Sequence, residues 1–582
     1  MNLKNLTVYL TAGLLFLLPL RFGSLAVMPE AGGFFPDDFS EWFFVSNWHP
    51  HSLAYFTAPL LILAIIVCGK KRLGSKILLF MLLWCIVPAL AVLPGAINGD
   101  PTIVQGELSL LLGCAPLFAA AGLLLSEEPE KAQIFISAIL LGAVVTAFYG
   151  WYQHFVTLPE LREYVAMQEA NGIPVSDGMK LKLQDYRLFS TMSSSNILAA
   201  LLMIAVICSF YAGNFFSRFI TPPRQGTWAI WIFAGLIFLP MLIMTHSRSA
   251  LVCPVTAGVL AIFSHPKIKM RWKIAGITGG VVLVAAGILL MAHFRGFGSI
   301  GERADYWRSC AILCKDHPLT GAGWGGFFKT HMQIKVSDID ESARDPHNVV
   351  ASFASQCGIP AGLLMLAVLL IPLVILWKHR FTSGIPGIVF WCGVIFTLHS
   401  LIDCDWQNPA MICIMGVLYL CAIAADPGRV PEKLPRWGIL ALFLITAGAG
   451  VWFSRSYLAG DYALSRLQDK VNPPNMEMQR KFARIPFEKF YKEAKEERPQ
   501  AAVIEIYAGD WYARRGLFRK AQEHYWKALE LDPVRPAAYA RLAELELQMG
   551  NREKAEELMN KAHELFPKSK AYTLEALYGK NQ

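Results

Sequence analysis

The chain has 582 residues, of which 54% are hydrophobic and 17% are charged, and its formal net charge is +9. Because soluble globular chains carry about 25% charged residues, this composition excludes a wholly soluble protein. The net charge does not indicate nucleic acid binding, since lysines and arginines lie in short groups between long apolar runs, as membrane topology signals do.

Long apolar runs follow one another through residues 1–455. A helix needs about 20 apolar residues to cross a bilayer, and by this measure the sequence predicts 12 or 13 spans, about 13 by direct count. The predicted spans are 7–27, 52–68, 77–97, 106–125, 133–154, 195–216, 227–245, 247–264, 274–292, 350–377, 385–403, 409–425 and 437–454. Thr245–Ser249 interrupts one long apolar stretch and is predicted to be a tight turn. Only Lys4 precedes the first run, and no small-residue cleavage site follows it, so we expect a retained span rather than a removed signal peptide.

Basic residues predict the orientation of these spans by the positive-inside rule. With the N-terminus in the cytoplasm, the cytoplasmic connections carry Lys70, Lys71, Arg72, Lys76, Arg218, Arg224, Lys267, Lys269, Arg271, Lys273, Lys378, Arg380, Arg429, Lys433 and Arg436. Only the connection 126–133 on that side is acidic, and the opposite connections are acidic or long, including a large loop at 293–349. An odd number of spans then places the C-terminal tail outside. In a bacterium this would be a multi-pass protein of the inner (cytoplasmic) membrane with its tail in the periplasm.

The tail contains a repeated pattern of small and aromatic residues. The first copy consists of Ala508, Gly509, Tyr512, Gly516, Ala521, Tyr525, Ala528 and Pro533. The second copy follows 34 residues later as Leu542, Ala543, Gly550, Ala555, Met559, Ala562 and Pro567. This period and this spacing predict tetratricopeptide repeats over 501–582, with a capping helix at 571–578. Residues 456–500 are amphipathic and are predicted to be a linker or a degenerate repeat; the repeats either bind a protein partner or pack on their own membrane domain.

The predicted fold is therefore all-α, a polytopic transmembrane bundle over 1–455 followed by a C-terminal α-solenoid. Most of the twelve cysteines lie in apolar segments, and none has the spacing of a zinc site, so they are predicted to pack as small hydrophobic residues. The sequence predicts no metal site and no cofactor.

Candidate site residues fall in four short segments on the predicted outer side. Arg248 lies in the tight turn, where it either snorkels to lipid headgroups or offers a fixed cation to a phosphate-bearing ligand. Arg303 and Trp307 lie one helical turn apart, before a glycine-rich stretch at 318–327 that we interpret as a structured loop.

The other two segments carry a histidine and two acids. His347 has an ordinary pKa of about 6.5, which suits a proton acceptor, although a single histidine is more often structural. The next residue, Asn348, either helps to form a site or caps the following helix. Asp403 and Asp405 either bind a metal or form an ion pair with one of the arginines, and we favour the ion pair.

These segments together resemble a known family. In chain order they are Arg187 with Asn196, Thr245-x-Ser247-Arg248, Arg303-x3-Trp307, Pro318-Leu319-x-Gly321-x-Gly323, His347-Asn348-x9-Gly358, and Asp403-x-Asp405. Their order, spacing and common side are similar to those of the O-antigen ligase and polymerase superfamily, and the resemblance covers most of 180–425. The ligase pattern has Gly, Thr or Tyr at the position where this chain has Ala361, which is followed by Gly362. This difference weakens the resemblance to the lipopolysaccharide ligases more than the resemblance to the superfamily.

The resemblance implies a membrane glycosyltransferase of surface polysaccharide biosynthesis. Such an enzyme moves a glycan from undecaprenyl diphosphate to an acceptor without a metal and with inversion, and the acceptor is lipid A-core, another glycan or a protein. Carried over, His347 would be the general base, and Arg248 and Arg303 would hold the leaving diphosphate. Arg187, Asn196, Trp307, Asn348, Asp403 and Asp405 would bind substrate.

Two other classes of function compete with the enzyme. A transporter of lipid-linked saccharides would need charged residues at mid-membrane and repeated halves, and the sequence has neither. A non-enzymatic membrane anchor that displays the repeats would not need the arginine and histidine segments. Membrane lipids are expected partners in every case, and nucleic acid in none.

Overall fold

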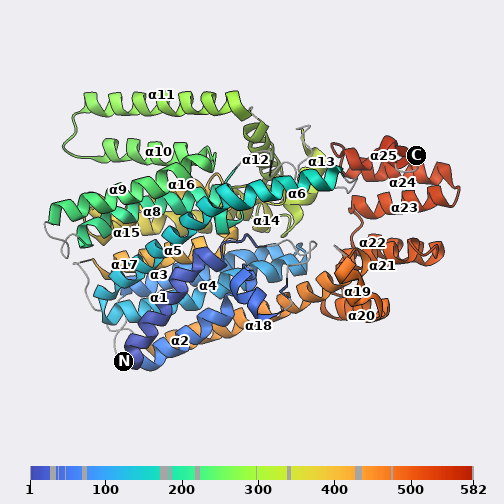
Figure 1. Cartoon of the computed structure of the whole chain (residues 1–582), viewed down its shortest axis with the longest axis horizontal. Coiled ribbons are helices and arrows are strands. Elements are labelled where there is room, and N and C mark those ends of the chain that lie inside the picture. The colour runs from blue at the N-terminus through green and yellow to red at the C-terminus, as the bar shows by residue number, and fades with distance from the viewer. Residues whose placement is uncertain are drawn as a thin grey trace.

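The computed structural model describes residues 2–26, 35–36, 38–45, 47–68, 75–170, 183, 187–216, 223–295, 298–336, 343–426, 436–473 and 476–579. Regular structure within these ranges is helical, without strands. Figure 1 shows a bundle of long helices with an array of short helices attached at one end. This arrangement confirms the predicted all-α class with a C-terminal repeat domain.

Apolar helices form the bundle. They are α1 (Leu3–Arg21), α2 (Ala54–Cys68), α3 (Ser75–Val92), α4 (Pro101–Glu127), α5 (Ala132–Tyr152), α8 (Ser195–Phe216), α9 (Pro223–Met244), α10 (Ser249–Ser264), α11 (Met270–Arg295), α15 (Ile359–Leu376), α16 (Ile385–Ser400) and α17 (Pro409–Ala424). Among the described residues, 6 stretches are long and apolar enough to cross a membrane, and five shorter apolar helices accompany them. The chain is therefore a membrane protein, and the larger number of spans stays a prediction.

Two helices form the centre of the bundle. Every residue of α17 is buried, as is 94% of the most apolar window of α4. The two helices meet closely at Gly416, where a Cβ atom would overlap the ring of Phe118. Around them the side chain of Trp84 packs against Phe396 and Trp406. Hydrophobic burial at this centre holds the helices together and so sets the positions of their polar ends.

The predicted span 350–377 is wrong as a single helix. It consists of α14 (Val349–Cys357) and α15, which are separated at Gly358. Gly358 has a φ of 96°, and the N–H of the next residue, Ile359, donates to the carbonyl oxygen of Pro318 instead of continuing the helix of α14. Glycine reaches this left-handed region without a steric cost, and Pro360 disfavours helical continuation before it, so the apolar run bends. The short helix α14 is thereby left at the same end of the bundle as α12 (Gly298–Asp316) and α13 (Gly326–Ile334).

The helix that contains the last predicted span continues into the tail. Helix α18 (Arg436–Val471) runs for 36 residues through the boundary predicted at 455/456. It is followed by α19 (Met476–Ala483), α20 (Phe487–Glu497), α21 (Ala502–Ala513), α22 (Phe518–Leu531), α23 (Pro536–Gln548), α24 (Arg552–Leu565) and α25 (Leu574–Gly579). Leu464 and Leu467 of α18 pack with Phe490 of α20 and Ile504 of α21 in one apolar cluster. The repeats therefore rest on the end of α18.

Small residues bring the helices of each repeat together, as predicted. A Cβ atom at Gly509 in α21 would overlap the ring of Tyr525 in α22. The predicted capping segment contains α25, whose Leu577 is fully buried against the second repeat. An ion pair of 2.9 Å between Nζ of Lys329 in α13 and Oδ1 of Asp532 also connects the array to the membrane domain.

Candidate functional site

One buried carboxylate gathers side chains from three distant segments at the tail-side end of the bundle. Asp403, in the turn after α16, is 1% exposed, and its Oδ2 accepts hydrogen bonds from Nδ2 of Asn196 at 2.5 Å and from Arg303 at 3.2 Å. Nδ1 of His347 lies 3.5 Å from its Oδ1. Burial alone would raise the pKa of Asp403, but the neighbouring His347 and Arg303 hold that pKa well below its usual range. The group is therefore an anion that orients three partners.

His347 has an unusual backbone conformation beside this carboxylate. Its φ is 53°, in the left-handed region, and its backbone N–H donates to Oδ1 of Asp345 at 2.8 Å. The imidazole stacks on the ring of Tyr306 and is 28% exposed. Burial lowers the pKa of His347, but Asp403 and Asp345 outweigh that effect and raise it above its ordinary value. A strained backbone held by specific bonds is typical of residues placed for function.

Arg187 and the tight turn join the same group of hydrogen bonds through Asn196. Arg187 donates to Oδ1 of Asn196 at 2.6 Å and, through Nε, to the carbonyl oxygen of Thr245 at 3.0 Å. The hydroxyl of Ser247 donates to the same Oδ1 at 2.9 Å. The predicted segments at 187–196, 245–249, 303 and 403 are thus linked by direct contacts.

A second series of hydrogen bonds connects the tight turn at 245–249 to Asp405. Oγ of Ser249 lies 2.6 Å from that of Ser247 and 2.9 Å from Nε2 of His399. Nδ1 of His399 lies 2.8 Å from Asp405, and both residues are fully buried. Asp405 therefore orients a buried histidine. Its predicted contact with substrate stays a prediction.

The remaining predicted residues lie at the margins of this arrangement. Arg248 is half-buried at the start of α10. In the sequence it lies between Ser247 and Ser249, whose hydroxyl groups are hydrogen-bonded to each other. Asn348 caps α14, since its Oδ1 accepts from the N–H of Ala351 at 3.0 Å. Trp307 is 41% exposed, whereas its neighbour Tyr306 is the residue that packs on His347. The structure thus brings Arg303 to the site and leaves Trp307 on the surface of α12.

The glycine-rich stretch is a structured loop, as interpreted from the sequence. Gly323 has a φ of 83°, and a Cβ atom there would overlap the backbone of Asn98 and Gly99. The N–H of Gly325 donates to Oε1 of Gln356 at 2.9 Å. The loop therefore ties the start of α4 to the end of α14, and both flank Asp403.

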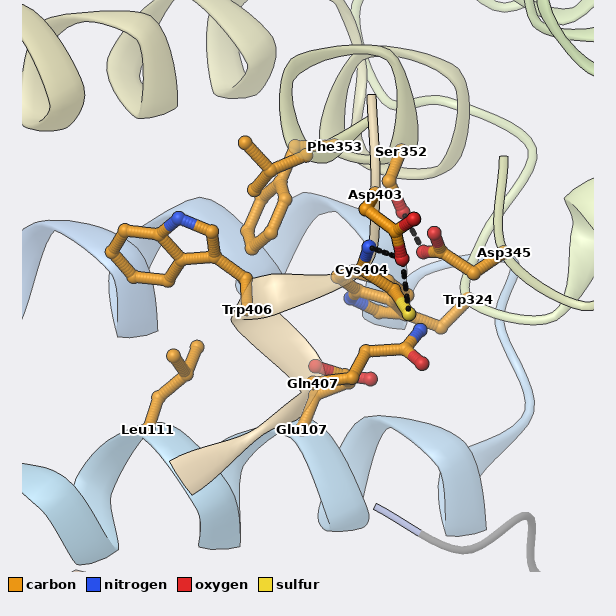
Figure 2. A pocket seen from close by; sticks show the side chains of 11 residues that line it. Glu107, Leu111, Trp324, Asp345, Ser352, Phe353, Asp403, Cys404, Trp406 and Gln407 are labelled. Carbon is orange, nitrogen blue, oxygen red and sulfur yellow. Dashed lines mark hydrogen bonds between the residues drawn. The ribbon is translucent and has the colours of Figure 1, made fainter. Parts of the chain in front are cut away.

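A cavity of about 20 Å³ lies between these elements, with room for about one water molecule. Figure 2 shows its lining, in which Asp345 and Asp403 lie across from Glu107 of α4. The sequence interpretation missed Glu107 and Asp345. The signal for Glu107 was its position inside the predicted span 106–125, because an ionisable residue within a span is by default a candidate functional residue.

One group of side chains has the arrangement of metal ligands. Donor atoms of His347, Asp403 and Cys404 lie within 4.8 Å of one another. Burial raises the pKa of the Cys404 thiol well above its ordinary value, and that thiol donates to Oδ1 of Asp403 at 3.4 Å. Asp403 already accepts hydrogen bonds from Asn196 and from the Arg303 guanidinium, which would repel a bound cation, so this set of donors fits a metal poorly.

Comparison with known proteins agrees with the motifs. An O-antigen ligase family model matches residues 233–366, and a tetratricopeptide repeat model matches residues 512–578. No curated protein sequence matches the chain at a significant level. The first match contains Arg248, Arg303 and His347, while Asn196 and Asp403 lie outside it. The resemblance is confirmed for residues 233–366, which match the O-antigen ligase model, and for the C-terminal repeats. These matches in a membrane protein support a membrane glycan-ligation function.

Proposed function

We propose that the chain is a glycosyltransferase that moves a glycan from undecaprenyl diphosphate to a hydroxyl group of an acceptor on the periplasmic face of the inner membrane. The acceptor is lipid A-core, a second glycan or a protein. The observation that carries this proposal is the convergence of Arg303 and His347 on the buried Asp403, inside the segment set that resembles the O-antigen ligases.

The general base of the proposed reaction is His347. With its imidazole next to the anionic Asp403, it takes the proton of the acceptor hydroxyl while that oxygen bonds to the anomeric carbon of the glycan. The bond from this carbon to the diphosphate oxygen breaks on the opposite side, and the diphosphate leaves with the electron pair. Attack opposite to the leaving group inverts the anomeric centre.

Guanidinium groups stabilise the charge that builds on the diphosphate. Arg303 is 25% exposed while it is bonded to Asp403 and to the carbonyl oxygen of Ile402, so it is held in place but reachable. Arg248 lies in the turn that is bonded to Asn196 through Ser247. Two such forks of donors would match phosphate oxygens, and this stabilisation requires no metal.

Transfer by purified protein from a synthetic undecaprenyl-diphosphate saccharide tests the proposal. Glycan transfer is expected to survive a chelator, the product is expected to have the inverted anomeric configuration by NMR, and His347→Gln, Arg248→Gln and Arg303→Gln are each expected to lose transfer. Full transfer in all three variants would remove the mechanism, and a retained anomeric configuration would remove the single displacement.

A further inference from the structure

A cleft of about 390 Å³ separates the tail from the tail-side end of the bundle. One wall consists of the start of α4 with residues 98–103, the glycine-rich loop, and α13. The other wall consists of tail residues 498–503 and 531–535. This volume lies within the range of about 300–1,000 Å³ that is usual for small-molecule sites.

The inner end of the cleft reaches the candidate site. Glu107, Trp324, Asp345 and Gln407 line both the cleft and the small cavity beside Asp403. Figure 2 shows Glu107 and Gln407 extending toward Asp345 and Cys404. A ligand that occupies the cleft would therefore end next to the residues that orient His347.

The carboxylate of Glu107 is available to a ligand. It is half-buried in α4, and no donor among the described residues forms a hydrogen bond or an ion pair with it. A carboxyl group removed from bulk water without a hydrogen-bond partner is costly, and a hydroxyl group of a ligand that bonds to it would offset that cost. Such a donor fits at the inner end of the cleft, where the carboxylate faces the cavity.

The charges along the cleft indicate which ligand fits. Its lining has four acidic and four basic side chains, and amides of Asn98, Gln356, Gln407 and Gln500 lie between them. A lining in which acidic, basic and amide side chains provide both donors and acceptors suits an uncharged polyhydroxyl molecule. It does not suit a diphosphate, because the side chains that line its inner end, Glu107, Trp324, Asp345 and Gln407, include no lysine or arginine.

We propose that this cleft admits a saccharide acceptor and that Glu107 binds the hydroxyl group that attacks. The proposal rests on the proposed function and deepens it, because it assigns the cleft to the acceptor and leaves Arg248 and Arg303, which do not line the cleft, to the donor. The tail then has a role in the reaction: it forms one wall of the acceptor site, and the Lys329–Asp532 ion pair holds that wall in place.

Glu107→Gln in the full chain tests the role of the carboxylate. The acceptor probe is the soluble oligosaccharide that mild acid releases from the envelope of the source cells, and the donor is the undecaprenyl-diphosphate saccharide. We expect the KM for the acceptor to rise about 3- to 10-fold, the range for a lost hydrogen bond. The KM for the donor and the slow transfer of glycan to water are expected to change less than about twofold, because no donor contact is removed. Glu130→Gln, just beyond the opposite end of α4, is the matched control and is expected to leave both KM values unchanged.

The outcomes separate this proposal from the proposed function. An unchanged acceptor KM in Glu107→Gln, or an equal rise in the donor KM, overturns the acceptor site while glycan transfer stands. No cleavage of the donor by the unaltered protein overturns the proposed function, and the acceptor site with it. Should Glu107→Gln fold poorly, Glu107→Asp replaces it. Binding of the same oligosaccharide without donor is then measured as a shift in Tm, and an equal shift in Glu107→Asp and in the unaltered protein contradicts the proposal. Transfer to a serine-containing peptide but not to the oligosaccharide also contradicts it.

Lys329→Gln tests the role of the tail. Because the ion pair is partly exposed, its loss is expected to raise the acceptor KM by up to about fivefold, without an effect on the donor KM. Arg552→Gln breaks an exposed ion pair with Glu556 in α24, away from the cleft, and is the control that is expected to leave both values unchanged. An equal change in both variants would mean that the tail acts only through its own stability.

Discussion

The two ends of α17 each have a buried aspartate with basic partners, and only one of them forms a candidate site. After the helix, Asp426 is 3% exposed and lies 3.2 Å from Lys76, 3.1 Å from Lys378 and 3.1 Å from His379. Before it, Asp403 is 1% exposed and has a similar set of partners, an arginine and a histidine. At both ends, therefore, a buried carboxylate has a histidine and at least one lysine or arginine as partners.

The surroundings of the two aspartates differ. Lys76 and Lys378 are 44% and 55% exposed, and both are among the basic residues that the sequence assigns to cytoplasmic connections. Asp403, in contrast, borders a cavity, and its partner His347 has a left-handed backbone. A buried carboxylate with a basic partner is therefore not enough to identify a site; reachable space and a costly conformation are what separate the two ends.

The largest expected difference concerns the two histidines. His347→Gln is expected to lower kcat of glycan transfer by about 10²–10⁴, the usual contribution of a general base, whereas His379→Gln at the other end should leave kcat unchanged. Both are measured by transfer from the lipid-linked donor. A comparable loss in the His379 variant would mean that the rate reports the stability of the bundle.

The next largest effect is expected at the basic partners. Arg303→Gln removes a donor to the leaving diphosphate and is expected to lower kcat by about 10²–10³, by analogy with oxyanion donors. Lys378→Gln removes an equal charge beside Asp426 and is expected to have no effect on kcat. An Arg303 variant of normal rate would remove this side chain from the reaction.

The aspartates themselves provide a test by pH. His347 acts as a base only when neutral, so the rate should rise as pH increases through its pKa, which Asp403 and Asp345 raise. Asp403→Asn removes one of these charges, lowers that pKa, and is expected to move the acidic limb of the kcat profile to lower pH. Asp426→Asn should leave the limb in place. A shift to higher pH in Asp403→Asn would contradict the assigned electrostatics.

The smallest expected effect is on stability at the Asp426 cluster. Asp426→Asn keeps the size of the side chain but loses ion pairs whose lysines are largely exposed, so the free energy of unfolding is expected to fall by at most about 1 kcal/mol. The change in Tm of the purified protein measures it. A collapse of folding would show that this cluster, too, is an essential element of the bundle.

Much of the architecture was predictable because it depends on periodic or local signals. Apolar runs predict the bundle, and the 34-residue spacing from Gly509 to Ala543 predicts the repeats. The break at Gly358 was not predicted, because hydropathy averages over a single left-handed residue. The continuity of α18 was missed for a related reason: composition changes at 455/456, but backbone hydrogen bonding does not.

The site was predictable as a set of residues but not as a set of contacts. The sequence favoured an ion pair between one of the acids and an arginine, and Asp403 with Arg303 is that pair. The hydrogen bond from Asn196 to Asp403 joins residues 207 apart, which no local pattern encodes. The sequence prediction named Trp307, whereas Tyr306 packs on His347. Both residues lie about one helical turn from Arg303, and tertiary packing decides between them.

The unbroken helix α18 has a consequence for the tail. At 1.5 Å per residue its 36 residues span about 54 Å, and each residue rotates the rest of the chain about the helix axis by about 100°. The angular position of the repeat array around the bundle is therefore set by a residue count. A single insertion between the last span and the first repeat would swing the array to another side of the protein, so exchanging tails between related chains has to preserve helical phase as well as sequence.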